Sequence, residues 1–464
     1  MLISQRGPDM NLFSKSSITR RSLLAQSGQA ASGLSLLGLL PRLSAAESTN
    51  PLAPDQPHFA PKASRVIFLF MPGGASHVDG FDPKPELQKF HGRDASKDRI
   101  FAGSLWGNHR CGMNGTLISN LYPHLGSCID DLCLIRSMHG DKGDHFEATL
   151  SMHSGTRAET LPGIGAWVSY GLGTTNPNLP SHVVFAETLP YAGAQSWDSN
   201  FLPACHQGTR ITPGADPIPN LTPDSATAAL QQKELDLLRR LNQRHMQSHQ
   251  HDSTLAARIY SFDAATGLQK KAPEVLDFSD ESDETLALYG IGRNDRKSFG
   301  WQCLAARRMS ERGVRFIEIV DRGNWDAHSN MKSYEKLCGN TDQAIAGLLT
   351  DLKQRGLLDE TLVVWCTEFG RTPSAPKTQV DGRDHYKDAF TCWLAGGGVK
   401  GGYVHGATDD MGEKITEDPV HIHDFHATIM HLLGFDHTKL TYHYSGRDFR
   451  LTGLAGNVIH DIIS

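Results

Sequence analysis

Long hydrophobic runs, paired-cysteine motifs and an excess of basic residues are all missing from this 464-residue sequence. No apolar stretch reaches the length of about 18 residues that a transmembrane helix needs, so we expect none. None of the eight cysteines belongs to a CxxC motif, which argues against a zinc knuckle and a thioredoxin-like redox site. Cys366 and Cys392 fall inside apolar runs and are predicted to be buried thiols, whereas the pairing of the other cysteines stays open.

The first 46 residues resemble an export signal rather than part of a fold. The pair Arg20-Arg21 precedes a weakly apolar run at residues 31–40, and Ser44-Ala45-Ala46 offers small residues to a signal peptidase. We therefore expect a twin-arginine signal peptide over residues 1–46, a linker over 47–63, and a periplasmic or otherwise exported protein. The alternative is a cytosolic arginine pair before a buried helix.

The charge balance narrows the class of partner. Without residues 1–46 the chain has 40 basic and 50 acidic side chains, a formal charge of −10. This balance argues against a nucleic-acid partner, which would need a basic face. An anionic substrate is still compatible with it, because a bound metal ion can reverse the local sign of the charge.

Short apolar runs alternate with helical patterns between residues 64 and 464. Uninterrupted β-branched runs are typical of strands that are buried on both faces. The pattern predicts an α/β fold: a doubly wound, mostly parallel sheet with helices on both faces, and a helical insertion at about 187–300. The predicted strands are Val66–Met71, Leu132–Ile135, Val183–Phe185, Val314–Val320, Thr361–Thr367 and Phe390–Ala395.

Acidic residues and histidines follow these strands. Asp326 and His328 come after one strand, Glu368 comes directly after another, and His385 lies in a glycine-marked turn. Parallel strands end at one edge of a sheet, so we expect these side chains to converge there. Carboxylate oxygens with imidazole nitrogens suit Zn²⁺ or Mn²⁺, whereas sites made only of oxygen ligands suit Mg²⁺ or Ca²⁺. The sequence therefore predicts a divalent metal site, with Zn²⁺ favoured.

A second metal position could be completed by Asp79 or His77 together with Asp144-His145. Two metal ions about 3.5–4 Å apart can clamp an ester oxyanion and activate a water molecule. For each residue alone there is a structural alternative, because Asp and His in turns often cap helices or bind backbone.

Charged residues at two further places could bind an anionic group. Asp144 and Glu147 fit a capping box, so a helix is expected to begin at about His145 and to offer free N–H groups to an anion. Arg136 and Arg371 could clamp an anion through their planar guanidinium groups, or could be ion-pair partners.

Five segments of the chain carry distinctive motifs: Met71–Pro85, Trp325–His328, Thr367–Pro373, Gly382–His385 and Asp424–Ile429. Together they resemble the exported bacterial family known as domain of unknown function 1501. That family is itself similar to the alkaline phosphatase and sulfatase superfamily, in which strand-end Asp and His residues bind two metals and a Ser, Thr or Cys at a helix start attacks the ester.

The departures from the superfamily pattern change the mechanism that the resemblance implies. Asp144 and His145 stand where the nucleophile would be, and Glu368-Phe369 replaces an Asp-His pair. Direct attack by a metal-activated water is then the simpler expectation. The resemblance implies an exported metal-dependent hydrolase of sulfate or phosphate esters, with sulfated glycans among its substrates. The alternative is a non-catalytic member that acts as an exported binding or assembly protein.

Overall fold

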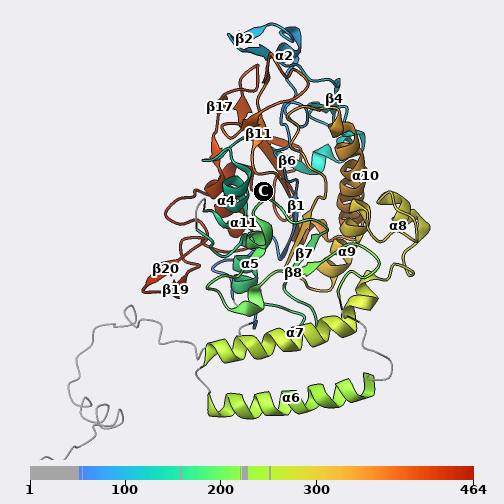
Figure 1. The fold of residues 1–464 in the computed structure, drawn as a ribbon, viewed down its shortest axis with the longest axis vertical. Helices are drawn as coiled ribbons and strands as arrows, with labels where there is room; N and C mark the ends of the chain where they lie inside the picture. The colour runs from blue at the N-terminus through green and yellow to red at the C-terminus, as the bar shows by residue number, and fades with distance from the viewer. Residues whose placement is uncertain (1–51, 55, 157–158, 220, 222–227, 250–251) are drawn as a thin grey trace, which may run out of the picture. The chain divides into compact units, whose positions relative to one another are not determined.

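All six predicted strands lie in one sheet of the computed structural model, which describes residues 52–54, 56–156, 159–219, 221, 228–249 and 252–464 (Figure 1). The predicted signal peptide, residues 1–46, lies outside these described residues, as does the first part of the predicted linker. The described chain forms a nine-stranded sheet. Its order is β15 (Tyr403–His405), β6 (Leu132–His139), β14 (Phe390–Ala395), β10 (Thr361–Cys366), β1 (Arg65–Phe70), β9 (Phe316–Val320), β7 (His182–Ala186) and β8 (Thr209–Ile211), with β18 (Val420–His421) paired to β6.

The sheet is parallel except at one strand. β1 lies between β10 and β9 and pairs in parallel with both, so Val66 is level with Leu362 on one side and Phe316 on the other. β14 is antiparallel to both of its neighbours, β10 and β6. The predicted α/β fold with a mostly parallel sheet is confirmed, whereas the direction of β14 was not anticipated.

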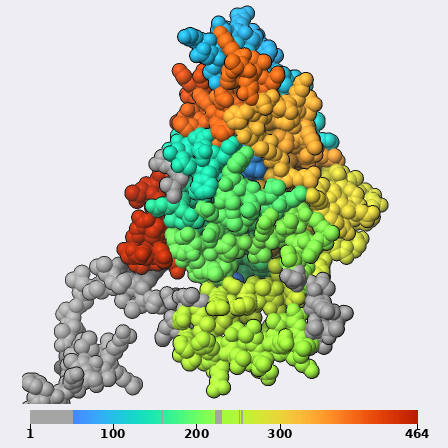
Figure 2. Space-filling view, viewed as in Figure 1, coloured from blue at the N-terminus to red at the C-terminus, as the bar shows by residue number. Residues whose placement is uncertain are grey.

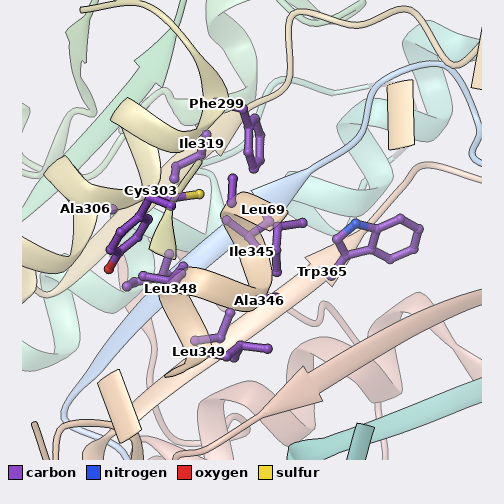
Figure 3. Packing of buried hydrophobic residues seen from close by; sticks show 14 of the residues in the cluster. Leu69, Phe299, Cys303, Ala306, Ile319, Ile345, Ala346, Leu348, Leu349 and Trp365 are labelled. Carbon is purple, nitrogen blue, oxygen red and sulfur yellow. The ribbon is translucent and has the colours of Figure 1, made fainter. Parts of the chain in front are cut away.

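Helices cover both faces of the sheet (Figure 1). Alternate residues of β1 enter two separate apolar clusters, with Ile67 and Leu69 in one and Phe68 and Phe70 in the other. Figure 3 shows Leu69 of β1 among Cys303, Ile345 and other side chains of the first cluster. That cluster includes α9 (Phe299–Glu311) and α10 (Ser333–Gln354), and the second includes residues of α4 (His145–Ser154), α5 (Ile164–Leu172) and α11 (Ile422–Leu432).

The range 187–300, predicted as a helical insertion, contains both helices and a strand of the sheet. Its helices are α6 (Ala228–Ser248), α7 (Ser253–Leu276) and α8 (Asp283–Leu288). β8 also falls in this range and pairs in parallel with β7, so this part of the range extends the main sheet.

The described end of the predicted linker is attached to the domain. The backbone N–H groups of Lys62 and Ala63 both donate to the carbonyl oxygen of Leu432 at the end of α11. All eight cysteines lie among the described residues and are free thiols, and Cys366 and Cys392 are buried as predicted. Among the described residues, no helix combines the length and the apolar character required to cross a bilayer.

Short elements connect these parts. They are α2 (Pro85–Lys89), β2 (Asp94–Ser96), β3 (Arg99–Phe101), β4 (Asn108–Cys111), β5 (Thr116–Ser119), α3 (Pro123–Gly126), β11 (Gly370–Arg371), β12 (Ser374–Pro376), β13 (His385–Tyr386), β16 (Ala407–Thr408), β17 (Ile415–Glu417), β19 (Tyr442–Tyr444) and β20 (Arg447–Phe449).

Because α11 contains a buried histidine, we expect the free energy of unfolding to depend on pH. His426 is fully buried, and its Nε2 lies 2.8 Å from the carbonyl oxygen of Met152. Burial lowers the pKa of His426 to about 3, whereas an imidazole of the unfolded chain has a pKa of about 6.5. Between these values the unfolded chain binds a proton that the folded chain does not, so the free energy of unfolding decreases as the pH falls.

We expect His426→Gln to lose less unfolding free energy than the wild type when the pH is lowered from about 7 to about 5. The amide of Gln keeps an N–H donor but does not titrate. Urea unfolding at both pH values measures the difference. His249→Gln, at an exposed position next to α6, should behave like the wild type. Equal losses in His426→Gln and the wild type would contradict the prediction.

Candidate metal centre

Loops from three neighbouring strands meet at the carboxyl edge of the sheet. β9, β1 and β10 are adjacent and parallel, so the segments that follow them emerge side by side. They carry Asp326 after β9, Gly73 after β1 and Glu368 after β10, and the first turn of α4 adds His145. Figure 2 shows, on one face, the teal surface of α4 next to the green segment that follows β7 and the orange C-terminal half of the domain.

Asp326 is the centre of the cluster. Its Oδ1 lies 3.0 Å from Nε2 of His328 and 3.3 Å from Nε2 of His385, and its Oδ2 lies 3.4 Å from Nε2 of His145. The Nε2 atoms of His328 and His385 are 2.9 Å apart. Ligand atoms of His145, Asp326 and His385 all lie within 4.8 Å of one another. The convergence of Asp326, His328 and His385 that the sequence predicts is therefore observed.

Each of the three histidines has a hydrogen-bond acceptor beside Nδ1, the ring nitrogen that does not face Asp326. Nδ1 of His145 lies 2.8 Å from Oε1 of Glu368, and Nδ1 of His385 lies 2.7 Å from the carbonyl oxygen of Gly143. Nδ1 of His328 lies 3.4 Å from Oδ1 of Asp384. An imidazole that donates from Nδ1 carries a lone pair on Nε2. All three lone pairs then face Asp326.

This inward arrangement fits a divalent cation. Nε2 of His145 is buried and has no hydrogen-bond partner in the described chain. Three lone pairs and a carboxylate that face one another repel unless a proton or a cation lies between them. Tetrahedral ligands at about 2.0–2.1 Å from Zn²⁺ lie about 3.3 Å apart, close to the separations around Asp326. Metal-binding histidines generally donate their other N–H group to a carboxylate or a carbonyl, as these do.

The electrostatic surroundings of Asp326 and His385 favour the protonation states that bind metal. Burial disfavours the charged form of Asp326, but the hydrogen bond and charge of Arg371 outweigh this and lower the pKa of the carboxyl group. Burial lowers the pKa of His385, against the opposing effect of its hydrogen bond to Gly143. An ionised carboxylate and a neutral imidazole are therefore the favoured forms near neutral pH.

Arg371 holds the carboxylate of Asp326 in place. Its side chain is fully buried, and its Nη2 lies 2.6 Å from Oδ1 of Asp326. It also donates to the carbonyl oxygens of Gly73, Gly74 and Arg383. Of the two roles that the sequence left open for Arg371, the structure shows the ion-pair partner.

Two other residues that the sequence singled out have partners outside the cluster. Asp79 is buried and accepts hydrogen bonds from Nε of Arg383 at 2.7 Å and from Oγ of Ser76 at 2.6 Å. Arg136 lies within β6, because this strand continues to His139, and it donates to the carbonyl oxygens of Phe81 and Leu117. The structure does not bring Asp79 or Arg136 into the cluster.

Asp144 caps α4 rather than leaving its N–H groups free. Its carboxylate accepts hydrogen bonds from the backbone N–H groups of Phe146 and Glu147. The helix begins at His145, as expected. Because the carboxylate already occupies these two donors, the expected anion pocket at the helix N-terminus is not left open.

A family model described as "Protein of unknown function (DUF1501)" matches residues 63–463. The chain belongs to this family. The match covers the whole sheet and every residue of the cluster. Comparison with curated proteins gives no match.

Several solved structures are similar to this member of the DUF1501 family. They include the lipoteichoic acid synthase LtaP from Listeria monocytogenes, at 10% identity over 85% of this chain and 76% of that chain with a TM-score of 0.37. The phosphonate monoester hydrolase from Silicibacter pomeroyi has 11% identity over 84% and 77%, with a TM-score of 0.36. A protein in the alkaline phosphatase superfamily from Vibrio parahaemolyticus has 10% identity over 83% and 70%, with a TM-score of 0.38. At such values these similarities do not define the chemistry of this DUF1501 member.

Two residues of the site were missed by the sequence reasoning. Asp384 orients His328, and it is adjacent to His385 in the same motif, so its position was a usable signal. Tyr191 stacks on the imidazole of His145 with ring centres 3.9 Å apart and its hydroxyl donates to Oδ1 of Asn324 at 3.0 Å. Nothing in the local sequence around Tyr191 indicates this contact.

Two glycines allow the loops to approach one another. Gly73 has a φ of +113°, and a Cβ there would lie 2.5 Å from the backbone nitrogen of Asp326. A Cβ on Gly382 would lie 1.6 Å from the carbonyl oxygen of His328. The segment that carries His385 can therefore reach the Asp326–His328 loop only without a side chain at position 382.

We expect Gly382→Ala to lower the free energy of unfolding by about 1–3 kcal/mol or more, as overpacking does, because backbone must move to accommodate the methyl group. Gly339→Ala is the matched control: this exposed position in α10 has no atom within 4 Å of the added Cβ. Urea unfolding should show the control equal to the wild type or more stable by up to about 1 kcal/mol. Equal stabilities of the two variants would contradict the close approach.

Proposed function

We propose that this protein is an exported metal-dependent hydrolase of sulfate or phosphate esters. The observation that carries the proposal is the inward orientation of His145, His328 and His385 around Asp326, with an acceptor behind each imidazole. Such a set suits a borderline metal ion, with Zn²⁺ favoured over Mn²⁺, Mg²⁺ or Ca²⁺.

Asp326, His145 and His385 would hold the metal, since their ligand atoms all lie within 4.8 Å of one another. A bound divalent ion supplies a Lewis acid that stabilises negative charge on an ester oxygen and lowers the pKa of water. His328 is the most exposed of the three histidines, with 41% of its side chain accessible. It would complete the ligand set or exchange a proton with solvent at Nε2.

The first turn of α4 favours water as the nucleophile. Asp144 and His145 occupy this turn, and neither provides a hydroxyl or a thiol. Ser151 is buried in the same helix, and Ser137 donates to the carbonyl oxygen of Asp418. We therefore propose direct attack by water, without a covalent enzyme intermediate.

Exposed aromatic side chains beside the cluster favour an ester carried by a carbohydrate over a small ester without a sugar. Phe146 follows His145, and Tyr191 stacks on it; both rings are about two-fifths exposed. Exposed aromatic rings can pack against the apolar face of a sugar, while polar groups read its substituents. Together with the proposed export, this supports a sulfated glycan outside the cytoplasm as substrate.

The metal proposal predicts that His145→Ala and His385→Ala each lose bound metal. Each change removes one ligand and leaves the sheet intact. Elemental analysis of purified, dialysed protein, with circular dichroism as the check of folding, measures the result. His249→Ala, at an exposed histidine next to α6, should keep the wild-type metal content.

Glu368→Gln offers a graded version of the same experiment. The change keeps the shape of the side chain but removes the anionic acceptor behind His145, so metal affinity should fall about 10–100-fold.

His328→Ala separates the two roles of His328: loss of metal assigns it as a ligand, and retained metal assigns it to proton exchange. Full metal content in both His145→Ala and His385→Ala would refute the site.

The hydrolase proposal predicts turnover of aryl sulfates, aryl phosphates or sulfated glycans by metal-loaded protein. Asp326→Asn should lower kcat/KM by about a hundredfold or more, because it removes the central anionic ligand. A chelator should abolish turnover and added metal should restore it. Stoichiometric metal without turnover of any ester would instead favour the binding or assembly function, which the absence of a hydroxyl or thiol at the start of α4 also supports.

A further inference from the structure

Helix α6 carries an exposed apolar stripe. Leu230, Leu237 and Leu241 are 51–56% exposed, and they lie on one side of the helix. Its other side contacts α7, where Nε2 of Gln231 donates to Oε1 of Gln269 and Arg239 lies 3.7 Å from Asp263. In Figure 1, α7 lies between α6 and the sheet. The described part of the domain therefore leaves the leucine stripe uncovered.

The stripe has the spacing of a coiled-coil seam. Residues 230, 234, 237, 241, 244 and 248 follow one another at intervals of four and three, which is the repeat that places side chains along one line of a supercoiled helix. Leucines occupy the centre of this line. Glu234 and Arg244 occupy the positions on either side of the centre, and both are exposed. Neither forms an ion pair with the rest of the described chain.

The order of these charges distinguishes two ways of pairing α6 with a copy of itself. In a parallel pair, Glu234 would face Glu234 and Arg244 would face Arg244, and like charges at a seam are repulsive. In an antiparallel pair with its two-fold axis at residue 239, Leu237 faces Leu241 of the second copy and Glu234 faces its Arg244. Every charge on the seam then meets an opposite charge.

We propose that α6 pairs in antiparallel orientation with α6 of a second copy of this chain, and that this contact forms a homodimer. The interface is isologous, because the same stripe serves both copies. A helix of 21 residues is about 30 Å long. A single helix pair of this length makes a small interface, so dimerisation should depend on protein concentration.

Sedimentation velocity of the full chain over a concentration series tests the proposal. The wild type should pass from monomer to dimer, and the double variant Leu237→Lys/Leu241→Lys should stay monomeric. Gln243→Lys adds one positive charge at an exposed position on another side of α6 and should dimerise like the wild type. A monomeric wild type at every concentration, or a dimer that persists in the leucine variant, would overturn the proposal.

Charge reversal tests the register. Glu234→Arg and Arg244→Glu should each weaken dimerisation by about tenfold or more, because each places like charges opposite one another. The double variant Glu234→Arg/Arg244→Glu exchanges the charges and should restore the wild-type dissociation constant. Failure of the double variant to restore it would overturn the antiparallel pairing. Circular dichroism of each variant confirms that α6 stays helical.

Discussion

The buried guanidinium of Arg371 is the interaction on which the carboxyl edge of the sheet depends. It donates to Gly73 and Gly74 after β1, to Arg383 before His385, and to Asp326 after β9. A buried charge is stable only when it is paired and hydrogen-bonded, and removal of one partner is costly. Because all of these donors must be satisfied, the loops are fixed relative to one another. Asp326 is thereby held in place at the centre of the cluster.

A second set of hydrogen-bond acceptors fixes the three histidines around Asp326. Glu368 is held by the backbone N–H of Gly73 at 2.7 Å while it accepts from His145, so one carboxylate connects the loop after β1 to α4. The carbonyl oxygen of Gly143 is the acceptor beside Nδ1 of His385, and the carboxylate of Asp384 is the acceptor beside Nδ1 of His328. The outer groups thus determine which nitrogen of each ring faces inward, and the inner lone pairs create the affinity for a cation.

Helix α4 is attached to the sheet at both of its ends. His145 in the first turn contacts Glu368, and His153 in the last turn lies 3.0 Å from the buried carboxylate of Glu318 on β9. Burial alone would lower the pKa of His153, but the charge of Glu318 outweighs this and raises it. The contact between His153 and Glu318 therefore favours the charged form of the imidazole, and it holds the helix that positions His145.

The sequence by itself determined the strands, their largely parallel arrangement and the Asp, Glu and His residues that follow them, because apolar runs and their ends are local properties of the chain. The convergence of Asp326, His328 and His385 followed from the rule that parallel strands end at one edge. Only the tertiary structure decided that Asp79 pairs with Arg383, that Arg136 lies inside β6, and that β14 runs antiparallel. It also brought Tyr191 to the cluster, together with His145, which the sequence had assigned to a second metal position. These outcomes depend on strand order and on contacts between residues remote in the chain, which local sequence patterns do not specify.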